Sequence, residues 1–196
     1  MKQEIGNLSG RADLTTGQDR KQKKEIRTEK SGREISAGLV VFRRTDEGPK
    51  FLLLYHGGRY WNFPKGKIEA EEKSLEAAAR ETGEETGLKA ADLRLKKKFK
   101  AYERFTFYRN RKRIFKIVIF YLAETRRRQI EVSSEHEGFG WFLYKDAQRL
   151  LKSYKDSETV LRQAYQFLRR EQETPAGGPP AGGLPPSRLP LRRRLF

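Results

Sequence analysis

Residues 66–88 read GKIEAEEKSLEAAARETGEETGL and are the most informative part of the chain. In this stretch a glycine loop precedes glutamates that recur at helical spacing. At about 100° per residue, Glu81, Glu84 and Glu85 share one narrow arc of a helix. The packing residues on the adjacent arc are Leu75, Ala78, Ala79, Thr82 and Thr86. The stretch therefore predicts a helix with one packing side and one carboxylate side.

Carboxylates that share one face of a helix repel one another. Like charges three or four residues apart destabilise an isolated helix by about 0.2–0.5 kcal/mol per pair, and a bound cation would relieve that repulsion. The chain has no cysteine and only two histidines. Hard oxygen ligands favour Mg²⁺ or Mn²⁺. We therefore expect a magnesium or manganese site on this helix.

The spacing also resembles the Nudix box, G-x5-E-x7-R-E-U-x-E-E-x-G-U, in which U is a bulky apolar residue. The fixed positions all match, and they are Gly66, Glu72, Arg80, Glu81, Glu84, Glu85 and Gly87. At roughly 7% per residue type, such a coincidence has a chance on the order of 10⁻⁸ at any one starting point. Leu88 fits one apolar position, whereas Thr82 is a mild departure at the other. The resemblance implies an α/β fold, the Nudix α/β/α sandwich with a mixed β-sheet.

Composition and charge divide the chain into three parts. Residues 1–33 form a polar, charged arm, residues 34–173 carry the apolar periodicity of the Nudix domain, and residues 174–196 form a Pro/Gly-rich basic tail. The formal net charge is +17, which makes RNA a candidate partner through the basic tails. No apolar run is long enough to cross a membrane, and the N-terminus has no apolar signal region. We expect a cytoplasmic monomer that makes no contact with a membrane.

The apolar pattern outside the glutamate helix predicts strands and two further helices. Two short runs separated by turn-forming residues predict a hairpin. One later run is apolar enough to be buried on both faces. The expected strands are 36–43, 50–56, 93–107, 114–123 and 141–144, and the expected helices are 145–151 and 157–170.

Within the superfamily, the chain most resembles the asymmetrical diadenosine tetraphosphate hydrolases. The shared features are the approach sequence WNFPKG at residues 61–66, the SEH segment that leads to Trp141, and the QFL motif at residues 166–168. This resemblance implies Mg-dependent hydrolysis of a nucleoside polyphosphate, most specifically diadenosine tetraphosphate to ATP and AMP. Bacterial RNA 5′-pyrophosphohydrolases share a similar approach sequence and are the alternative. A catalytically idle Nudix module that binds nucleic acid or a partner is a third reading, which the intact box disfavours.

The resemblance also implies roles for the acidic residues. Glu81, Glu84 and Glu85 would hold the metal, and Arg80 would pair with a box glutamate and orient it. Glu72 would support that arrangement, while Gly66 and Gly87 would serve backbone conformation. Glu135, from the loop before Trp141, would be a further metal ligand or the general base, and it fits better than Glu137. The base is therefore Glu81, Glu85 or Glu135.

Substrate contacts are expected from lysines, a histidine and aromatic rings. Lys65 precedes the box, and Lys116 interrupts an apolar strand, so both are candidates to bind phosphates of a small-molecule nucleoside polyphosphate. His136 could donate to a phosphate, whereas His56 is expected to be structural. The rings expected to stack on a base are Tyr108, Tyr102, Phe167 and Trp61.

Overall fold

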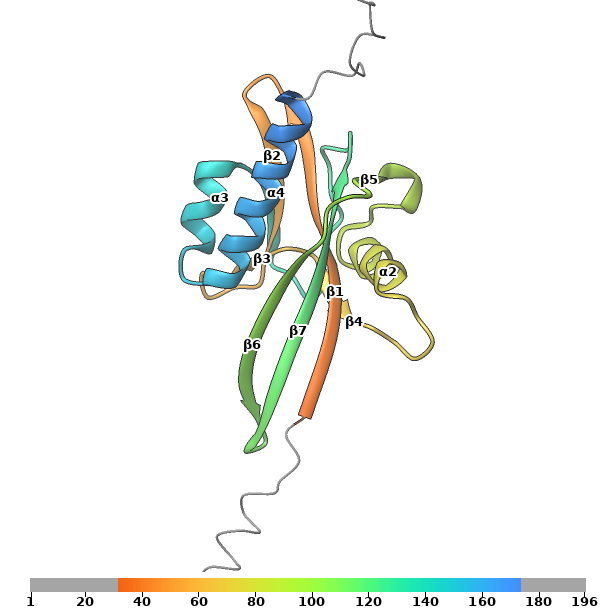
Figure 1. Cartoon of the computed structure of the whole chain (residues 1–196), viewed down its shortest axis with the longest axis vertical. Helices are drawn as coiled ribbons and strands as arrows, with labels where there is room; N and C mark the ends of the chain where they lie inside the picture. Colours follow the sequence, from red (N-terminus) through yellow and green to blue (C-terminus); the bar gives the residue numbers. More distant parts are fainter. Residues whose placement is uncertain (1–31, 174–196) are drawn as a thin grey trace, which may run out of the picture.

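The computed structural model describes residues 32–173 of the chain (Figure 1). The tail of residues 174–196 and most of the arm of residues 1–33 lie outside the described residues, so the predictions for them are not tested. The strands are β1 Gly32–Thr45, β2 Gly48–Tyr55, β3 Trp61–Asn62, β4 Lys65–Lys67, β5 Arg94–Leu95, β6 Ala101–Arg109, β7 Lys112–Glu124 and β8 Gly138–Leu143. The helices are α2 Ser74–Thr86, the 3-10 helix η2 Ala90–Asp92, α3 Tyr144–Leu151 and α4 Lys155–Glu173.

The strands form one mixed sheet around β1. Strand β1 runs parallel to β7 from Gly32↔Ile114 to Phe42↔Glu124. The pairs β1–β2, β6–β7 and β2–β8 are antiparallel. Short β4 pairs with β1 at residues 36–38, along a different part of the strand from β2. The predicted hairpin is confirmed, because β1 and β2 turn over directly between Thr45 and Gly48.

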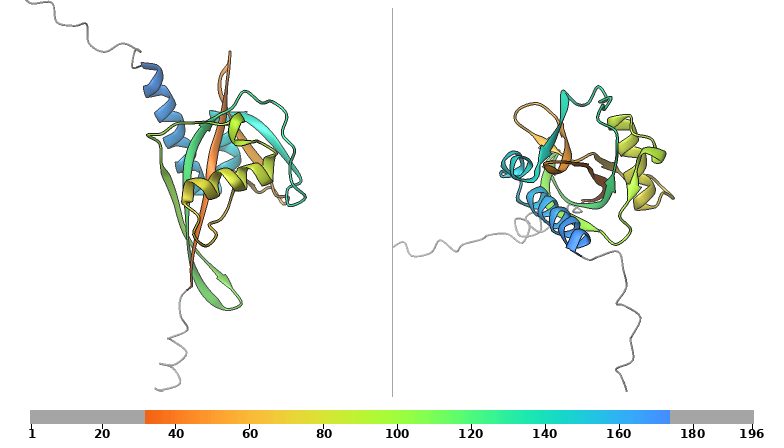
Figure 2. Two further views of the ribbon diagram at one scale, coloured as in Figure 1. Left: turned by 90° about the vertical axis from the view of Figure 1, so that its right-hand side faces the viewer. Right: turned by 90° about the horizontal axis from the view of Figure 1, so that it is seen from above.

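Helices cover both faces of the sheet (Figures 1 and 2). Helix α2 lies on one face, over a core cluster that includes Leu39, Val41 and Leu54. Helices α3 and α4 lie on the other face, over a cluster that includes Phe42, Phe51 and Phe120. The predicted α/β/α sandwich with a mixed sheet is therefore confirmed. No helix within residues 32–173 is long and apolar enough to cross a membrane.

Three predicted strands differ from those observed. The strand expected over residues 93–107 is split into β5 and β6, because Phe99 donates its backbone N–H to Lys96 in a turn and buries its side chain. Strand β7 is buried only in its C-terminal half, where Val118 and Phe120 lie; Phe115 is 38% exposed, because the N-terminal half extends beyond the helices (Figure 1). Strand β8 ends at Leu143, so Tyr144 begins α3 instead of ending a strand.

Candidate active site

Helix α2 has a defined beginning and end. The Glu76 carboxylate accepts the backbone N–H of Lys73 at 3.1 Å, which satisfies one of the donors that a helix N-terminus exposes. The helix ends at Gly87, whose φ of 69° is left-handed and whose N–H donates to the Gly83 carbonyl at 2.8 Å. A side chain would be strained in that conformation. Gly87 thus has the backbone role that the sequence predicts.

Gly66 has a different role from the one expected. Its φ is not in the positive region, so conformational freedom is not what requires glycine there. A Cβ atom at this position would lie 1.9 Å from Cδ of Glu81, which no structure tolerates. The backbone of β4 and the Glu81 carboxylate are therefore in direct contact, and the missing side chain is what allows it.

Arg80 makes hydrogen bonds to the carboxylates of three glutamates. Its Nε and Nη2 donate to the two carboxylate oxygens of Glu72 at 2.9 and 3.0 Å, a bidentate pair. Its Nη1 donates to Glu81 at 3.0 Å and to Glu84 at 3.1 Å, and Nη2 also reaches the Lys67 carbonyl of β4 at 3.0 Å. The Arg80 hydrogen bond lowers the pKa of Glu72 below its ordinary value. One guanidinium thus joins the helix, the loop before it and β4.

Glu85 does not share the open face predicted for it. The side chain of Glu84 is 58% exposed, whereas that of Glu85 is 11% exposed and lies with Ala77, Ala78, Thr82 and Thr86 on the packing side. Leu75, predicted to pack, is 36% exposed instead. Glu85 is buried because β4 lies against the helix and the Lys65 backbone N–H donates to its Oε2 at 2.9 Å.

Burial sets the protonation behaviour of Glu85. Desolvation raises the pKa of Glu85 to about 7, and the negative charges of Glu81 and Glu135 act in the same direction. The Lys65 backbone hydrogen bond and the Lys65 ammonium oppose that rise. Glu81 and Glu135 are therefore both close enough to repel the Glu85 carboxylate.

The carboxylates fit a divalent cation chemically, although they are not preassembled for one. Among residues 32–173, no group of three or more Asp, Glu or His side chains stands at the spacing of a formed metal site. Arg80 occupies one oxygen of Glu81 and one of Glu84, and the second oxygen of each has no hydrogen-bond partner among the described residues. Such free carboxylate oxygens are the ligands that Mg²⁺ and Mn²⁺ prefer.

The two predicted late glutamates lie in different settings. Glu135 is exposed, and its charge acts on both Glu85 and His136, so it lies near the carboxylate helix. Glu137 donates its backbone N–H to the Tyr55 carbonyl at 2.8 Å, and its carboxylate rests against Gly57. Glu137 is thus engaged with the end of β2, and Glu135 is the one whose charge reaches the site.

The two histidines form a pair beside Glu85, in which His136 is buried and His56 is partly buried. The ring centroids of His56 and His136 are 4.5 Å apart. His136 Nε2 is 3.7 Å from Glu85 Oε1, and its Nδ1 is 3.1 Å from Ser133 Oγ. Burial and the Lys65 charge lower the pKa of His136, and they lower that of His56 to about 4. Both rings are therefore neutral at pH 7.

The Lys65 ammonium acts electrostatically both on residues near the carboxylate helix and on residues of the opposite face of the sheet. Its positive charge acts on Glu85 and the two histidines, and also on Glu103 of β6 and Lys116 of β7. Lys116 is half-buried opposite Phe105, and burial followed by the Lys65 charge lowers its pKa. The two predicted lysines are therefore close enough for their positive charges to affect each other.

A cavity of about 690 Å³ is lined by Phe105, which pairs with Lys116, and by Glu103, on which the Lys65 charge acts. Sequence reasoning missed the residues that line it. The rings of Tyr60 and Tyr154 meet edge to face at 4.8 Å, and Asn62 donates to the Tyr60 hydroxyl at 2.7 Å. The remaining lining residues are Ser153, Lys155, Asp156 and Ser157. Glu103 is buried, and desolvation raises its pKa. The only sequence signal for this cavity was Glu103, a carboxylate in the aromatic-rich strand β6.

The predicted stacking rings lie elsewhere. Trp61 packs on Tyr55 and Phe142, with centroids 4.9 and 5.2 Å apart. Phe167 packs on Phe99 at 5.6 Å in the core beneath α4. Tyr108 is 74% exposed near the tip of the β6–β7 hairpin. Tyr102 is 41% exposed on β6, and none of the four predicted rings lines the cavity.

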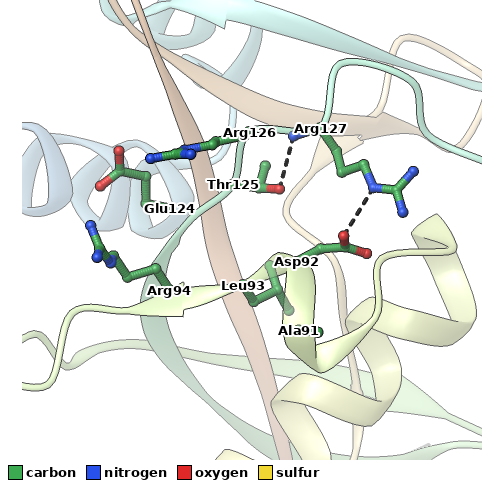
Figure 3. Close-up of a pocket in the computed structure, with 8 residues that line it drawn as sticks. All are labelled: Ala91, Asp92, Leu93, Arg94, Glu124, Thr125, Arg126 and Arg127. Carbon is green, nitrogen blue, oxygen red and sulfur yellow. Dashed lines mark hydrogen bonds and ion pairs between the residues drawn. The ribbon is translucent and has the colours of Figure 1, made fainter.

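A second hollow of about 540 Å³ lies where β7 ends (Figure 3). Its wall carries Arg94, Arg126 and Arg127 together with the carboxylates of Asp92 and Glu124. Arg127 donates to Asp92 at 2.9 Å, and Arg44 pairs with Glu124 at 3.3 Å. This hollow lies four or more residues along β1 from Gly38, the partner of Lys65, which is roughly 13 Å or more in a strand.

Residues 32–168 match the NUDIX domain, over more than two thirds of the chain. The chain belongs to the Nudix family. It is therefore a hydrolase that acts on phosphoric anhydride bonds of nucleoside polyphosphates, and Nudix hydrolases generally use divalent metal ions.

Comparison with individual proteins gives more specific similarities than the family match does. It is 34% identical over 143 residues to the asymmetrical bis(5′-nucleosyl)-tetraphosphatase of Sus scrofa, covering 68% of this chain and 94% of the relative. The enzyme of the same name from Caenorhabditis elegans is 29% identical over 136 residues. The crystal structure of a C. elegans Ap4A hydrolase binary complex superposes with a TM-score of 0.60 at 28% identity, covering 70% of this chain and 98% of that one.

Proposed function

We propose that this Nudix hydrolase splits diadenosine tetraphosphate into ATP and AMP with Mg²⁺. The position of Lys65 carries the proposal. Its backbone N–H holds Glu85 of the carboxylate helix, and its ammonium acts on Glu103 and Lys116 beside the aromatic cavity. A polyphosphate that extends from the helix to the cavity would pass both lysines.

In this proposal, the phosphate under attack lies at α2. Glu81, Glu84 and Glu85, with Glu135, would hold Mg²⁺, which when bound neutralises phosphate oxygens and acidifies water. Arg80 fixes Glu81 and Glu84 through hydrogen bonds of 3.0 and 3.1 Å. One carboxylate among Glu81, Glu85 and Glu135 accepts the proton of the attacking water.

The nucleoside distal to the cleaved bond would occupy the cavity lined by Tyr60, Phe105 and Tyr154. Its volume of about 690 Å³ lies in the usual range for small-molecule sites. Aromatic walls favour a purine base by stacking. Lys65 and Lys116 then hold the phosphates between the base and α2, and His136 supports Glu85 from the side. A fixed register of this kind on a symmetric substrate produces unequal products.

The comparisons support this choice of substrate. The relatives from Sus scrofa and C. elegans are both named as asymmetrical tetraphosphatases. This chain covers at least 94% of each of them, so the similarity spans the whole enzyme and is not limited to the box.

Analysis of early products tests the proposal. Incubation with diadenosine tetraphosphate and Mg²⁺ should yield ATP and AMP in equal amounts with no early ADP. Tyr154→Ala should raise KM more than it lowers kcat, because the ring contacts the base and not the reacting phosphorus. Two equivalents of ADP would contradict the asymmetric register. No cleavage, together with rapid pyrophosphate or phosphate release from triphosphorylated RNA, would establish the RNA 5′-pyrophosphohydrolase alternative.

A further inference from the structure

The β6–β7 hairpin and the first part of β1 extend beyond the helices as a free three-stranded sheet (Figures 1 and 2). The β6–β7 pairing is continuous from Ala101↔Phe120 to Arg109↔Lys112, and β1 joins it from Gly32↔Ile114. Because this register has no interruption, side chains alternate regularly between the two faces. The two faces can therefore be assigned residue by residue.

One face of this sheet continues the side on which α2 lies. Ala37 of β1 and Ile119 and Tyr121 of β7 contact the core cluster beneath α2. Moving along the strands two residues at a time, and across to β6, gives nine side chains on the same face. Three of them are Ile35, Thr106 and Ile117. The other six are three rings, Tyr102, Tyr108 and Phe115, and three arginines, Arg33, Arg104 and Arg113. We call these six residues the sheet platform.

The rings of the sheet platform are exposed. Tyr102 is 41% exposed, Tyr108 74% and Phe115 38%, and their neighbour Ile35 is 38% exposed. These four make up half of the eight large apolar side chains exposed within residues 32–173. Several exposed rings on one face of a sheet indicate an interaction surface, whereas single exposed apolar residues do not.

The charge of the platform is of one sign. Its three arginines are exposed, and none makes an ion pair with another described residue. The Arg104 guanidinium lies 5.0 Å from the Tyr102 ring centroid, and the Lys100 ammonium lies 5.8 Å from it. The nearby strand carboxylates, Glu34 and Glu103, alternate to the opposite face. The platform therefore attracts polyanions and repels a second copy of itself.

We propose that the sheet platform binds single-stranded nucleic acid. Rings on an open sheet stack with unpaired bases, and arginines contact the phosphates between them. From Tyr102 to Tyr108 the platform extends over six residues of β6, about 20 Å in a strand, enough for several nucleotides. This surface is separate from the aromatic cavity, because none of the six platform residues lines it.

The arginine hollow at the end of β7 supplies a matched control. Arg94 and Arg126 make no ion pair with another described residue, as is true of the platform arginines, but the hollow contains two carboxylates and no aromatic ring (Figure 3). Reversing two charges there changes the net charge by the same amount as reversing two on the platform. Any difference between the two variants therefore reports position and not total charge.

The experiment measures binding of the full-length protein to a fluorescent 12-nucleotide RNA with a 5′-hydroxyl. This probe has no anhydride bond, so the result is independent of the proposed hydrolysis. Tyr102→Ala and Phe115→Ala should each weaken binding about fivefold or more through lost stacking. Arg104→Glu/Arg113→Glu should weaken it further and lower the salt slope by about 1.4, or 0.7 for each lost contact. Arg94→Glu/Arg126→Glu should retain wild-type affinity.

Four outcomes would overturn the proposal. These are equal losses in the two charge-reversal variants, wild-type affinity in both ring variants, equal binding of heparin and RNA, and a light-scattering dimer that Phe115→Ala dissociates. A preference for RNA over DNA of the same sequence would support contact with the 2′-hydroxyl, and equal binding would support recognition through the bases and phosphates that both share. Urea unfolding midpoints of all variants should match the wild type, and losses confined to unfolded variants would overturn the assignment.

Discussion

Two charged regions of this Nudix domain differ in how their charges are satisfied. At the carboxylate helix, Arg80 binds Glu72, Glu81 and Glu84, and the Lys65 backbone binds Glu85. On the sheet platform, the guanidinium groups of the arginines make no ion pair with another described residue, and the rings are open to solvent. Charged groups held by partners keep a defined position, as catalysis requires. Unpaired charged groups remain available to bind a polyanion from solution. The predictions below test that contrast.

The largest effect is expected from Glu85→Gln. Glutamine keeps the acceptor for the Lys65 N–H at 2.9 Å but removes a negative charge from the proposed metal site. The value of kcat should fall by about 10³-fold or more, and the urea midpoint should not fall, because the variant removes a buried charge. Steady-state turnover of diadenosine tetraphosphate measures this, with Glu137→Gln as the control that should retain activity. Near wild-type turnover at saturating Mg²⁺ would remove Glu85 from the site.

Gly66→Ala should produce the second largest effect. The new methyl group would occupy the position 1.9 Å from Glu81 Cδ, so the Glu81 carboxylate must move. We expect a loss of about 10²-fold in kcat and a destabilisation of about 1–3 kcal/mol from overpacking. Gly138→Ala is the matched control, because a Cβ there meets nothing within 4 Å. Equal effects of the two substitutions would show that contact between β4 and Glu81 is unimportant.

Glu103 gives a smaller, pH-dependent effect. Burial raises its pKa above the ordinary value of 4.5, so the folded state binds the proton more tightly than the unfolded state does. Stability should therefore fall as the pH rises from about 4.5 to the folded pKa, with a slope of at most about 1.4 kcal/mol per pH unit. Urea unfolding from pH 4 to 8 should show a steeper decline in the wild type than in Glu103→Gln, which keeps only the contribution of Glu85. Parallel curves would contradict the assignment.

The smallest effect on hydrolysis is expected from removal of residues 1–31 and 174–196. Their polar or Pro/Gly-rich composition cannot bury much apolar surface, so they should add little to the fold. We expect kcat and KM for diadenosine tetraphosphate to change by less than about twofold, and salt-sensitive RNA affinity to fall because basic residues are lost. A truncated protein without small-substrate activity would show that a terminal segment reaches the site.

Local pattern was sufficient for some features of the site and not for others. The box spacing located α2, and the Gly87 terminus followed from it, because both depend on residues adjacent in sequence. The convergence of Tyr60, Phe105 and Tyr154 on one cavity did not follow, since these residues come from three separated segments. Trp61 and Phe167 were expected to stack on a base, but aromatic character alone does not distinguish a packed ring from an open one.

The sequence by itself determined the family, the glutamate helix and the α/β class, because helical periodicity and motif spacing are properties of neighbouring residues. Only the tertiary structure decided that Glu84 is open while Glu85 is buried, that Gly66 is needed for contact with Glu81, and that one face of β6 and β7 is uncovered. The physical reason is that burial and close approach depend on which distant strand or helix lies against a residue. The adjacent glutamates differ because β4, 20 residues earlier in the chain, covers only one of them.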